Sequence, residues 1–265
     1  MAIRIEMLRK INMIWVIIPA YNEGSQIRFV LENLNHVLDS LRIERRIVIV
    51  DDGSSDDTAE QAEALSGRIP NEVVRHDVNR GVSAAFRTGF DYVLDLSQSD
   101  DLILTLEANK NADPSIIPDM IARIRSSADL VLASCYAPGG RVIGDPLIRY
   151  LMSWGINLML SIVFPIRTSG SIHTYTSFYR LATRRLYSET RERTAGKYFE
   201  QEGFVCMADM LIRMSQFPDV RIVEVPLILK SDIREHSSKM KIGRTILGYL
   251  RLFWSNLIHR SDTRP

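Results

Sequence analysis

The sequence predicts an α/β protein built on a doubly wound, mostly parallel sheet, and three observations lead to this fold class. Residues 14–18 and 47–50 are apolar runs without polar alternation, as expected of strands covered on both faces. Apolar residues at helical spacing occupy 23–41 between them, which makes one βαβ unit. Segments typical of strands and helices then keep alternating as far as residue 133.

The other elements of the first half follow in chain order. A helix is expected over 58–65, where Ser55, Asp56 and Asp57 can cap its free amide groups. The pattern then predicts a strand over 72–75, a helix over 81–92, a strand over 102–106, a helix over 116–124 and a strand over 130–133. Pro114 suits the first turn of the helix that follows it.

The second half is expected to be more helical. Helices are predicted over 147–163, 181–190 and 204–214, with a strand over 220–225. From Lys239 onward, apolar residues share a predicted helix with basic ones, so this helix is amphipathic and basic. We therefore expect one domain over residues 1–230 and a basic amphipathic segment over 231–265.

Composition excludes several classes of protein. A chain of 265 residues suits one large domain, and a formal charge of +1 provides no basic field for binding nucleic acid. Two cysteines, Cys135 and Cys206, predict reduced thiols and a cytoplasmic location. Charged residues interrupt the first twelve positions, unlike a secretory signal, and the longest apolar stretch, 156–166, is about half the roughly 20 residues that span a bilayer.

Polar clusters follow three of the predicted strands at the points where the strands end. They are residues 19–23 after the first strand, 51–55 after the second, and 107–111 after the strand that ends at Leu106. In an open parallel sheet, ligands bind beyond the carboxyl ends of the strands. We therefore expect the three clusters to meet at one edge and form a single site.

The acidic pair Asp51 and Asp52 indicates nucleotide chemistry. Carboxylates at a strand end can accept hydrogen bonds from ribose hydroxyls or a base N–H, and a later oxygen-rich segment can hold a divalent cation against a diphosphate. The alternative is that both residues only form a turn and cap a helix, as Asp-Gly commonly does. No G-x-G-x-x-G follows the first strand, so a dinucleotide-dependent oxidoreductase is not expected.

Read together, three motifs closely resemble those of the family 2 glycosyltransferases, which are inverting enzymes of the GT-A fold. The motifs are I-I-P-A-Y-N-E at 17–23, I-V-D-D-G-S-S-D-D-T at 49–58 and N-R-G at 79–81. The resemblance continues through 136–140, 175–180, 223–226 and 234–239, so it covers nearly the whole chain. Within the family, the chain looks most like the polyprenyl-phosphate (dolichol-phosphate) mannose or glucose synthases.

The resemblance implies roles for specific residues. The nucleotide-sugar pocket is expected to be lined by Pro19, Tyr21, Glu23, Asp51, Asp52 and Gly81. The family's Asp-x-Asp segment and a third ligand two residues on hold Mg²⁺ or Mn²⁺, and Glu107, Asn109 and Asn111 stand at those positions. One carboxylate replaces two, which predicts a weaker hold on the cation.

The resemblance also points to cationic residues late in the chain. Arg180, Arg234 and Lys239 match positions that bind the acceptor phosphate or the donor diphosphate, and Glu107, Asn109 and Arg180 are the expected catalytic residues. Three other positions depart from the family pattern: Cys135 replaces an Arg, Val82 a Lys and Thr174 an Asp. No role is carried over to those three.

The function predicted from these residues is transfer of a hexose from GDP or UDP to a polyprenyl phosphate. A phosphate oxyanion is already a nucleophile, so the absence of an Asp at Thr174 is compatible with this acceptor. Two alternatives stay open: transfer to a growing glycan, and a sugar-nucleotide-binding subunit that has lost turnover. The helix over 147–163 and the basic C-terminal helix predict contact with the inner face of a membrane or with a membrane-protein partner, and packing on the domain itself is the other option.

Overall fold

The computed structural model describes residues 11–111, 113–166, 171–231, 245 and 247–254. Its elements run, in chain order, β1 (Met13–Ala20), α1 (Gly24–Ser40), β2 (Glu44–Asp51), α2 (Thr58–Glu63), β3 (Asn71–Arg75), α3 (Val82–Leu96), β4 (Leu102–Thr105), η1 (Pro114–Ile116), α4 (Ile117–Arg125), β5 (Leu130–Ser134), β6 (Arg141–Ile143), α5 (Leu147–Val163), β7 (Arg180–Thr183), α6 (Arg184–Arg193), η2 (Gly203–Val205), α7 (Cys206–Met214), β8 (Ile222–Pro226) and β9 (Ile228–Lys230). Residues 247–254 are also helical, and we call them the C-terminal helix.

One seven-stranded sheet forms the centre of the protein, in the order β3-β2-β1-β4-β7-β5-β8. All neighbouring strands are parallel except at β7, which runs antiparallel to both β4 and β5. β6 and β9 pair separately as a parallel two-stranded sheet. The predicted fold class, a doubly wound and mostly parallel α/β fold, is confirmed.

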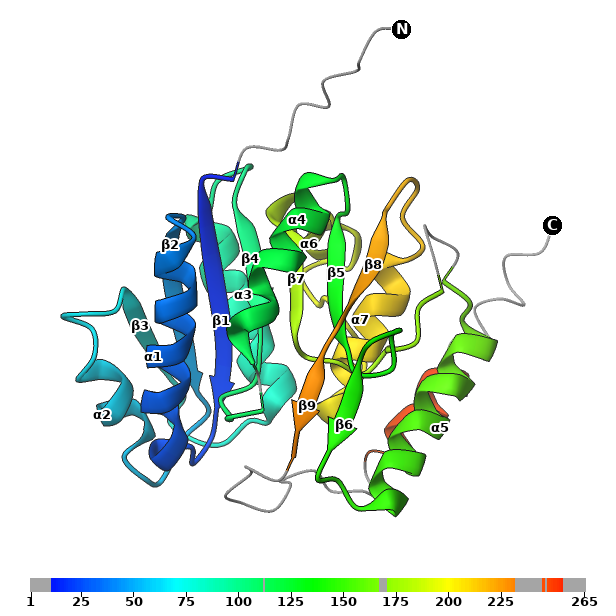
Figure 1. Ribbon diagram of the computed structural model, residues 1–265, viewed down its shortest axis with the longest axis horizontal. Coiled ribbons are helices and arrows are strands. Elements are labelled where there is room, and N and C mark those ends of the chain that lie inside the picture. Colours follow the sequence, from blue (N-terminus) through cyan, green and yellow to red (C-terminus); the bar gives the residue numbers. More distant parts are fainter. Residues whose placement is uncertain (1–10, 112, 167–170, 232–244, 246, 255–265) are drawn as a thin grey trace, which may run out of the picture.

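Helices cover both faces of this sheet, as the uninterrupted apolar strands require (Figure 1). α1 and α4 pack on one face around a core that includes Ile14, Val16 and Ile18 of β1. α3, α6 and α7 pack on the other face, where Trp15 and Ile17 of the same strand lie. Successive residues of β1 thus point into two different cores, which explains why the strand shows no polar alternation.

The register of the central strands aligns the ends that carry the predicted site. Ala20 of β1 lies opposite Asp51 of β2, and Ile17 of β1 lies opposite Thr105 of β4. α3 approaches β1 closely at Gly89, where a Cβ atom would come within 2.4 Å of Ile17 Cγ2. A larger residue at position 89 would therefore push α3 away from the sheet.

The prediction of a helix over 181–190 is wrong at its start. Arg180–Thr183 form β7, and the helix α6 begins only at Arg184, with the Thr183 hydroxyl accepting a hydrogen bond from the Leu186 amide at 3.4 Å. Leu181 and Ala182 have no strong strand propensity. They form a strand because they pair antiparallel with both β4 and β5, which lie on either side of them in the sheet. This pairing depends on distant segments, so the local sequence does not predict it.

α5 lies apart from the main sheet, and the C-terminal helix lies beside it (Figure 1). Phe164, just after α5, stacks on Phe253 with ring centroids 5.7 Å apart. Tyr249 and Leu252 of the C-terminal helix are buried in the same core as α7. Within the described residues, none of the helices combines the length and hydropathy that a bilayer crossing requires.

Candidate active site

A cavity of about 1350 Å³ opens at the carboxyl ends of the central strands. Its walls come from the loops that follow β1, β3 and β4, from the start of α3, from residues 200–204 and from the C-terminal helix. The lining residues are Pro19, Ala20, Tyr21, Glu23, Gln26, Asp52, Asn79, Arg80, Gly81, Val82, Ser83, Ala85, Glu107, Ala108, Asn109, Phe178, Glu200, Gln201, Glu202, Gly203, Phe204, Thr245, Leu247, Gly248 and Arg251.

The three predicted polar clusters meet in this cavity. Tyr21 comes from the loop after β1, Asp52 from the end of β2, and Glu107 from the loop after β4, and all three line the same space. Pro19, Glu23, Gly81 and Asn109 of the predicted set line it as well. The parallel register of β1, β2 and β4 explains the meeting, because strands that run side by side in one direction end at one edge.

Asp52 organises the wall on the α3 side of the cavity. Its buried carboxylate accepts hydrogen bonds from the Arg80 amide at 2.9 Å and from the Gly81 amide at 2.7 Å. His76 Nδ1 lies 2.8 Å from the same carboxylate, and the Thr88 hydroxyl lies 2.9 Å from His76 Nε2. Because a carboxylate accepts hydrogen bonds, Nδ1 is the ring nitrogen that donates to Asp52, and Nε2 faces the Thr88 hydroxyl.

A glycine lets the chain after β3 pass beside the end of β2. Gly53 has φ +70, and a Cβ atom there would lie 2.5 Å from the Val78 carbonyl carbon. Both the backbone angle and the space therefore require glycine. The close passage is what places Arg80 and Gly81 within reach of Asp52.

The residues after Asp52 fasten the two loops to each other and do not line the cavity. Asn22 Oδ1 accepts a hydrogen bond from the Ser55 amide at 2.8 Å, and Thr58 Oγ1 accepts one from the Glu23 amide at 2.8 Å. Asp56 accepts from the Gly24 amide at 3.1 Å and from the Thr58 amide at 3.1 Å. Of the predicted cap at 55–57, Asp56 thus serves the starts of both α1 and α2, whereas Asp57 makes no side-chain cap hydrogen bond.

The structure places Asp51 away from the cavity lining. Its carboxylate is buried and accepts hydrogen bonds from the amide of Ser54, at 3.1 Å, and from the Ser54 hydroxyl. This is the geometry of a turn. Of the acidic pair, only Asp52 reaches the cavity.

Glu107, Asn109 and Asn111 form a chain of hydrogen bonds. Asn109 Nδ2 donates to Glu107 Oε2 at 2.8 Å, and Asn109 Oδ1 accepts from the Asn111 amide at 3.0 Å. The amide oxygen of Asn109, which is the atom able to bind a cation, therefore faces the backbone. Asn111 is buried outside the cavity lining, and its Oδ1 has no hydrogen-bond partner in the described structure.

Arg180 lies in the core, away from the cavity. Its side chain is 0% exposed, and the guanidinium donates to the carbonyls of Ser177 at 2.7 Å, Met207 at 2.7 Å and Tyr175 at 2.8 Å. Burial lowers the pKa of Arg180 to about 10. This geometry ties β7 to α7 and does not bring Arg180 to a phosphate. Arg234 and Lys239 lie outside the described residues.

Residues 200–204 form a wall that sequence reasoning missed. Asp209 of α7 accepts hydrogen bonds from the amides of Glu200 at 2.6 Å and Gln201 at 2.9 Å. Arg87 of α3 pairs with Glu202 at 2.8 Å, and the Ser83 hydroxyl donates to the same carboxylate. In the local sequence, a polar run precedes an amphipathic helix. This pattern does not predict which distant elements contact the polar run.

A comparison with protein families shows which family the chain belongs to. The model of "Glycosyl transferase family 2" matches residues 15–191, more than half of the chain and all three polar clusters. The chain belongs to glycosyl transferase family 2. The expected family is thereby confirmed.

Similar enzymes of known sequence carry names that concern lipid phosphates. The dolichol-phosphate mannosyltransferase of Pyrococcus furiosus is 31% identical over 89% of this chain and 61% of its own length, so the chain spans about three fifths of that protein. The undecaprenyl-phosphate mannosyltransferase of Micrococcus luteus is 28% identical over 80% of this chain and 81% of its own. The polyprenol monophosphomannose synthase of Mycolicibacterium smegmatis is 29% identical over 80% and 75%.

Solved structures of GT-A glycosyltransferases share the fold. Glucosyl-3-phosphoglycerate synthase of Mycobacterium tuberculosis, solved with Mn²⁺, UDP and phosphoglyceric acid, has a TM-score of 0.65 and 20% identity, covering 91% of this chain and 78% of its own. Mannosyl-3-phosphoglycerate synthase of Rubrobacter xylanophilus has a TM-score of 0.65 and 16% identity, covering 96% and 76%. At these identities the likeness concerns the fold alone.

The cavity of this family 2 member is acidic. Five carboxylates line it, those of Glu23, Asp52, Glu107, Glu200 and Glu202. The guanidinium groups that line it are only those of Arg80 and Arg251, within the part of the chain that the structure describes. A nucleoside diphosphate entering such a space gains from an accompanying cation.

The cavity residues fit a divalent cation only together with a diphosphate. Among the described residues, no group of three His, Cys, Asp or Glu side chains could hold a metal ion. Glu107 offers one carboxylate, while the Asn109 amide oxygen faces Asn111. Mg²⁺ is often held by one or two carboxylates, substrate phosphates and water, and that is the arrangement that these residues allow.

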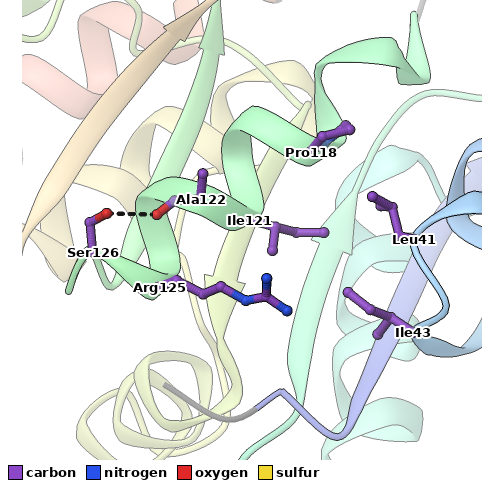
Figure 2. Close-up of a pocket in the computed structure, with 7 residues that line it drawn as sticks. All are labelled: Leu41, Ile43, Pro118, Ile121, Ala122, Arg125 and Ser126. Carbon is purple, nitrogen blue, oxygen red and sulfur yellow. Dashed lines mark hydrogen bonds between the residues drawn. The ribbon is translucent and has the colours of Figure 1, made fainter. Parts of the chain in front are cut away.

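A second, smaller hollow of about 390 Å³ lies at the opposite ends of the strands, ahead of β2 and β5 (Figure 2). Leu41 and Ile43 form one side, and Pro118, Ile121 and Ala122 of α4 form the other. Its charged group is the Arg125 guanidinium. The described residues that line this hollow include no carboxylate, histidine or cysteine, so they do not offer the chemistry that a transferase site needs.

Proposed function

We propose that this glycosyltransferase moves a hexose from GDP or UDP to a polyprenyl phosphate, with inversion at the anomeric carbon. The observation that carries the proposal is that Tyr21, Asp52 and Glu107 line one cavity that continues to the apolar C-terminal helix. The names of the relatives support the acceptor class. The part of the cavity lined by Tyr21, Asp52 and Glu107, its polar end, suits a nucleotide sugar, and Leu247 of the C-terminal helix offers an apolar contact for a lipid.

The donor would bind at the polar end of the cavity. Tyr21, Glu23 and Asp52 face the nucleoside, and Arg80 with the start of α3 faces the diphosphate. α3 has 15 residues, and its N-terminal amide groups concentrate positive potential where Arg80 and Gly81 line the cavity. Asp52 keeps this wall in place through its bonds to both backbone amides.

Mg²⁺ or Mn²⁺ would be held by Glu107 with the diphosphate oxygens. When bound, the cation stabilises the negative charge that grows on the departing nucleoside diphosphate. Asn109 orients the Glu107 carboxylate through its amide hydrogen. The roles predicted for Glu107, Asn109 and Asn111 remain predictions, and the geometry favours Glu107 as the ligand.

The transfer itself would be a single displacement. A phosphate oxygen of the acceptor attacks the anomeric carbon and forms the new C–O bond while the bond to the diphosphate breaks. The departing nucleoside diphosphate takes the bonding electron pair. No proton has to be removed from a phosphate oxyanion, so the reaction needs no general base.

A glycan acceptor is the second candidate, because two further carboxylates line the cavity. A sugar hydroxyl needs a base, and Glu200 or Glu202 would have to supply it. Desolvation raises the pKa of Glu202, but hydrogen bonds from Ser83 and Arg87 and the charge of Arg87 together lower it, which makes Glu202 a poor base. Glu200 forms an ion pair with Arg213 at 3.3 Å. A lipid phosphate therefore suits the site better.

The protein would reach its lipid substrate by lying on the inner face of a membrane. α5 exposes a row of large apolar side chains, with Leu147 71% and Ile162 70% exposed, and the C-terminal helix exposes Trp254 at 70%. Contiguous apolar surface of this kind marks an interaction site. Shallow insertion into the headgroup region would cover it without a spanning helix.

Transfer of labelled hexose to undecaprenyl phosphate tests the proposal. GDP- and UDP-linked mannose and glucose are each incubated with the 265-residue chain, Mn²⁺ and the lipid, and label is measured in the organic extract. Label in that extract, released by mild acid as free sugar, supports the proposal. Tight nucleotide binding with no transfer to any lipid phosphate or glycan would indicate the sugar-nucleotide-binding subunit instead.

A further inference from the structure

Two arginines of the cavity differ from their neighbours in their ion pairing. Arg80 and Arg251 both line the space, and within the described residues neither forms an ion pair. By contrast, Arg87 and Arg213, which do not line the cavity, pair with its Glu202 and Glu200. A guanidinium that forms no ion pair within the described residues can bind an anionic group of a ligand.

The two arginines sit on different walls. Arg80 precedes α3, at the polar end where the diphosphate is proposed to lie. Arg251 belongs to the C-terminal helix, together with Leu247 and Gly248, which also line the cavity. The reaction proposed above involves two phosphate-bearing substrates, so each of two separate cationic positions can bind the phosphate of one substrate.

Packing holds the C-terminal helix close to the cavity wall. Tyr249 and Leu252 are buried, and Phe253 stacks on Phe164. The helix also approaches residue 205 so closely that a Cβ atom at Gly248 would lie 2.9 Å from Val205 Cγ2. These contacts place the backbone of Arg251 at the rim of the cavity.

The same helix connects the rim to the exposed apolar surface. Leu247 stands one helical turn before Arg251, lines the cavity and is still 48% exposed. Leu250 and Trp254, 57% and 70% exposed, continue the apolar surface outward. A cation at the rim followed by apolar side chains toward the outside matches an amphiphile with a phosphate head.

We propose that Arg251 binds the phosphate of the acceptor and that Leu247 contacts the hydrocarbon next to it. This inference rests on the proposed function and names the residues that select its acceptor. A guanidinium can donate two hydrogen bonds to one phosphate, so Arg251 would fix the orientation of the attacking oxygen as well as supply charge. A soluble phosphate ester would share the Arg251 contact and lack the Leu247 contact.

Binding measured apart from turnover tests the inference. The wild-type chain and its Arg251→Ala, Arg251→Lys and Leu247→Asn variants are titrated with farnesyl phosphate, farnesol, glycerol 3-phosphate, GDP and UDP in a calorimeter. Arg123→Ala is the matched control, because Arg123 is an exposed arginine in the last turn of α4 and does not line the cavity. Circular dichroism verifies that each variant is folded.

We expect Arg251→Ala to weaken farnesyl phosphate binding about tenfold to a hundredfold, the loss of a charged hydrogen bond, and to leave farnesol and nucleotide binding unchanged. Arg251→Lys should recover part of the loss, and Leu247→Asn should weaken farnesyl phosphate but not glycerol 3-phosphate. Unchanged binding in Arg251→Ala, or an equal loss of nucleotide affinity, overturns the phosphate assignment.

The remaining outcomes separate the two proposals. If glycerol 3-phosphate binds as tightly as farnesyl phosphate, and Leu247→Asn changes neither, the lipid part of the inference is overturned. A wild-type chain that binds farnesyl phosphate through Arg251 but transfers no sugar to a polyprenyl phosphate counts against the proposed function alone.

Discussion

The Gly81 amide donates a 2.7 Å hydrogen bond to the Asp52 carboxylate, which ties the end of β2 to the start of α3. The same carboxylate holds the Arg80 amide and His76, so one buried side chain orients the loop that leads into the α3 wall of the cavity. This gives Asp52 a structural role in addition to any contact with the donor.

Asp52→Asn should weaken both the fold and nucleotide binding. The substituted amide presents one donor group to partners that are themselves donors, so at least one hydrogen bond is lost in a buried place. We expect a loss of about 1–3 kcal/mol in the free energy of unfolding and about tenfold weaker GDP or UDP binding. Urea denaturation and calorimetry measure the two effects. Asp100→Asn, at an exposed position, serves as the control, and an equal response of both variants would contradict the prediction.

Asn109→Asp should restore binding of a divalent cation in the absence of nucleotide. The change places a second carboxylate where Asn109 Nδ2 now lies 2.8 Å from Glu107 Oε2, and the two charges repel until a cation joins them. In thermal denaturation, Mn²⁺ should raise the melting temperature of the wild type only when GDP or UDP is present, and that of Asn109→Asp with Mn²⁺ alone. Glu107→Gln should abolish the response to Mn²⁺. Stabilisation of the wild type by Mn²⁺ alone would disprove the nucleotide-dependent site.

Ile162→Glu should reduce binding to anionic vesicles. Ile162 is 70% exposed on α5, so a charge there costs little stability, about 0.5 kcal/mol or less, but opposes insertion into the headgroup region. Flotation with vesicles containing phosphatidylglycerol measures the effect. Leu96→Glu is the matched control, because Leu96 is 50% exposed at the end of α3, on a different element. Equal flotation of both variants and the wild type would argue against α5 as the membrane contact.

Alkylation of Cys135 should require strongly alkaline solution. Burial raises the pKa of its thiol from 9.0 to about 11, so at neutral pH almost none of the reactive thiolate is present. The iodoacetamide reaction rate of the folded protein should rise with a midpoint near pH 11, and that of the denatured protein near pH 9. Because the folded-state pKa is the higher one, the associated stability is complete below about pH 9 and is lost as the pH rises through 11. Cys135→Ser provides the control, and a midpoint near pH 9 in the folded protein would refute the expectation.

The local sequence determined the parallel half of the fold and the three clusters of the candidate site. The apolar runs of β1 and β2 alternate between two cores, and parallel strands end at one edge, so the sequence alone places Tyr21, Asp52 and Glu107 together. The motifs around them identified the family, which the family comparison confirmed. These features depend on short segments whose patterns are complete within a few residues.

Tertiary structure decided the features that depend on partners far along the chain. β7 is a strand because it fills the slot between β4 and β5, and Arg180 became a core residue because that strand is covered by α7. Residues 200–204 and Arg251 joined the cavity through contacts with α3, α7 and the core, which no spacing in the sequence records. Hydrophobic periodicity reports whether a segment is covered, but it contains no information about which distant side chain covers it.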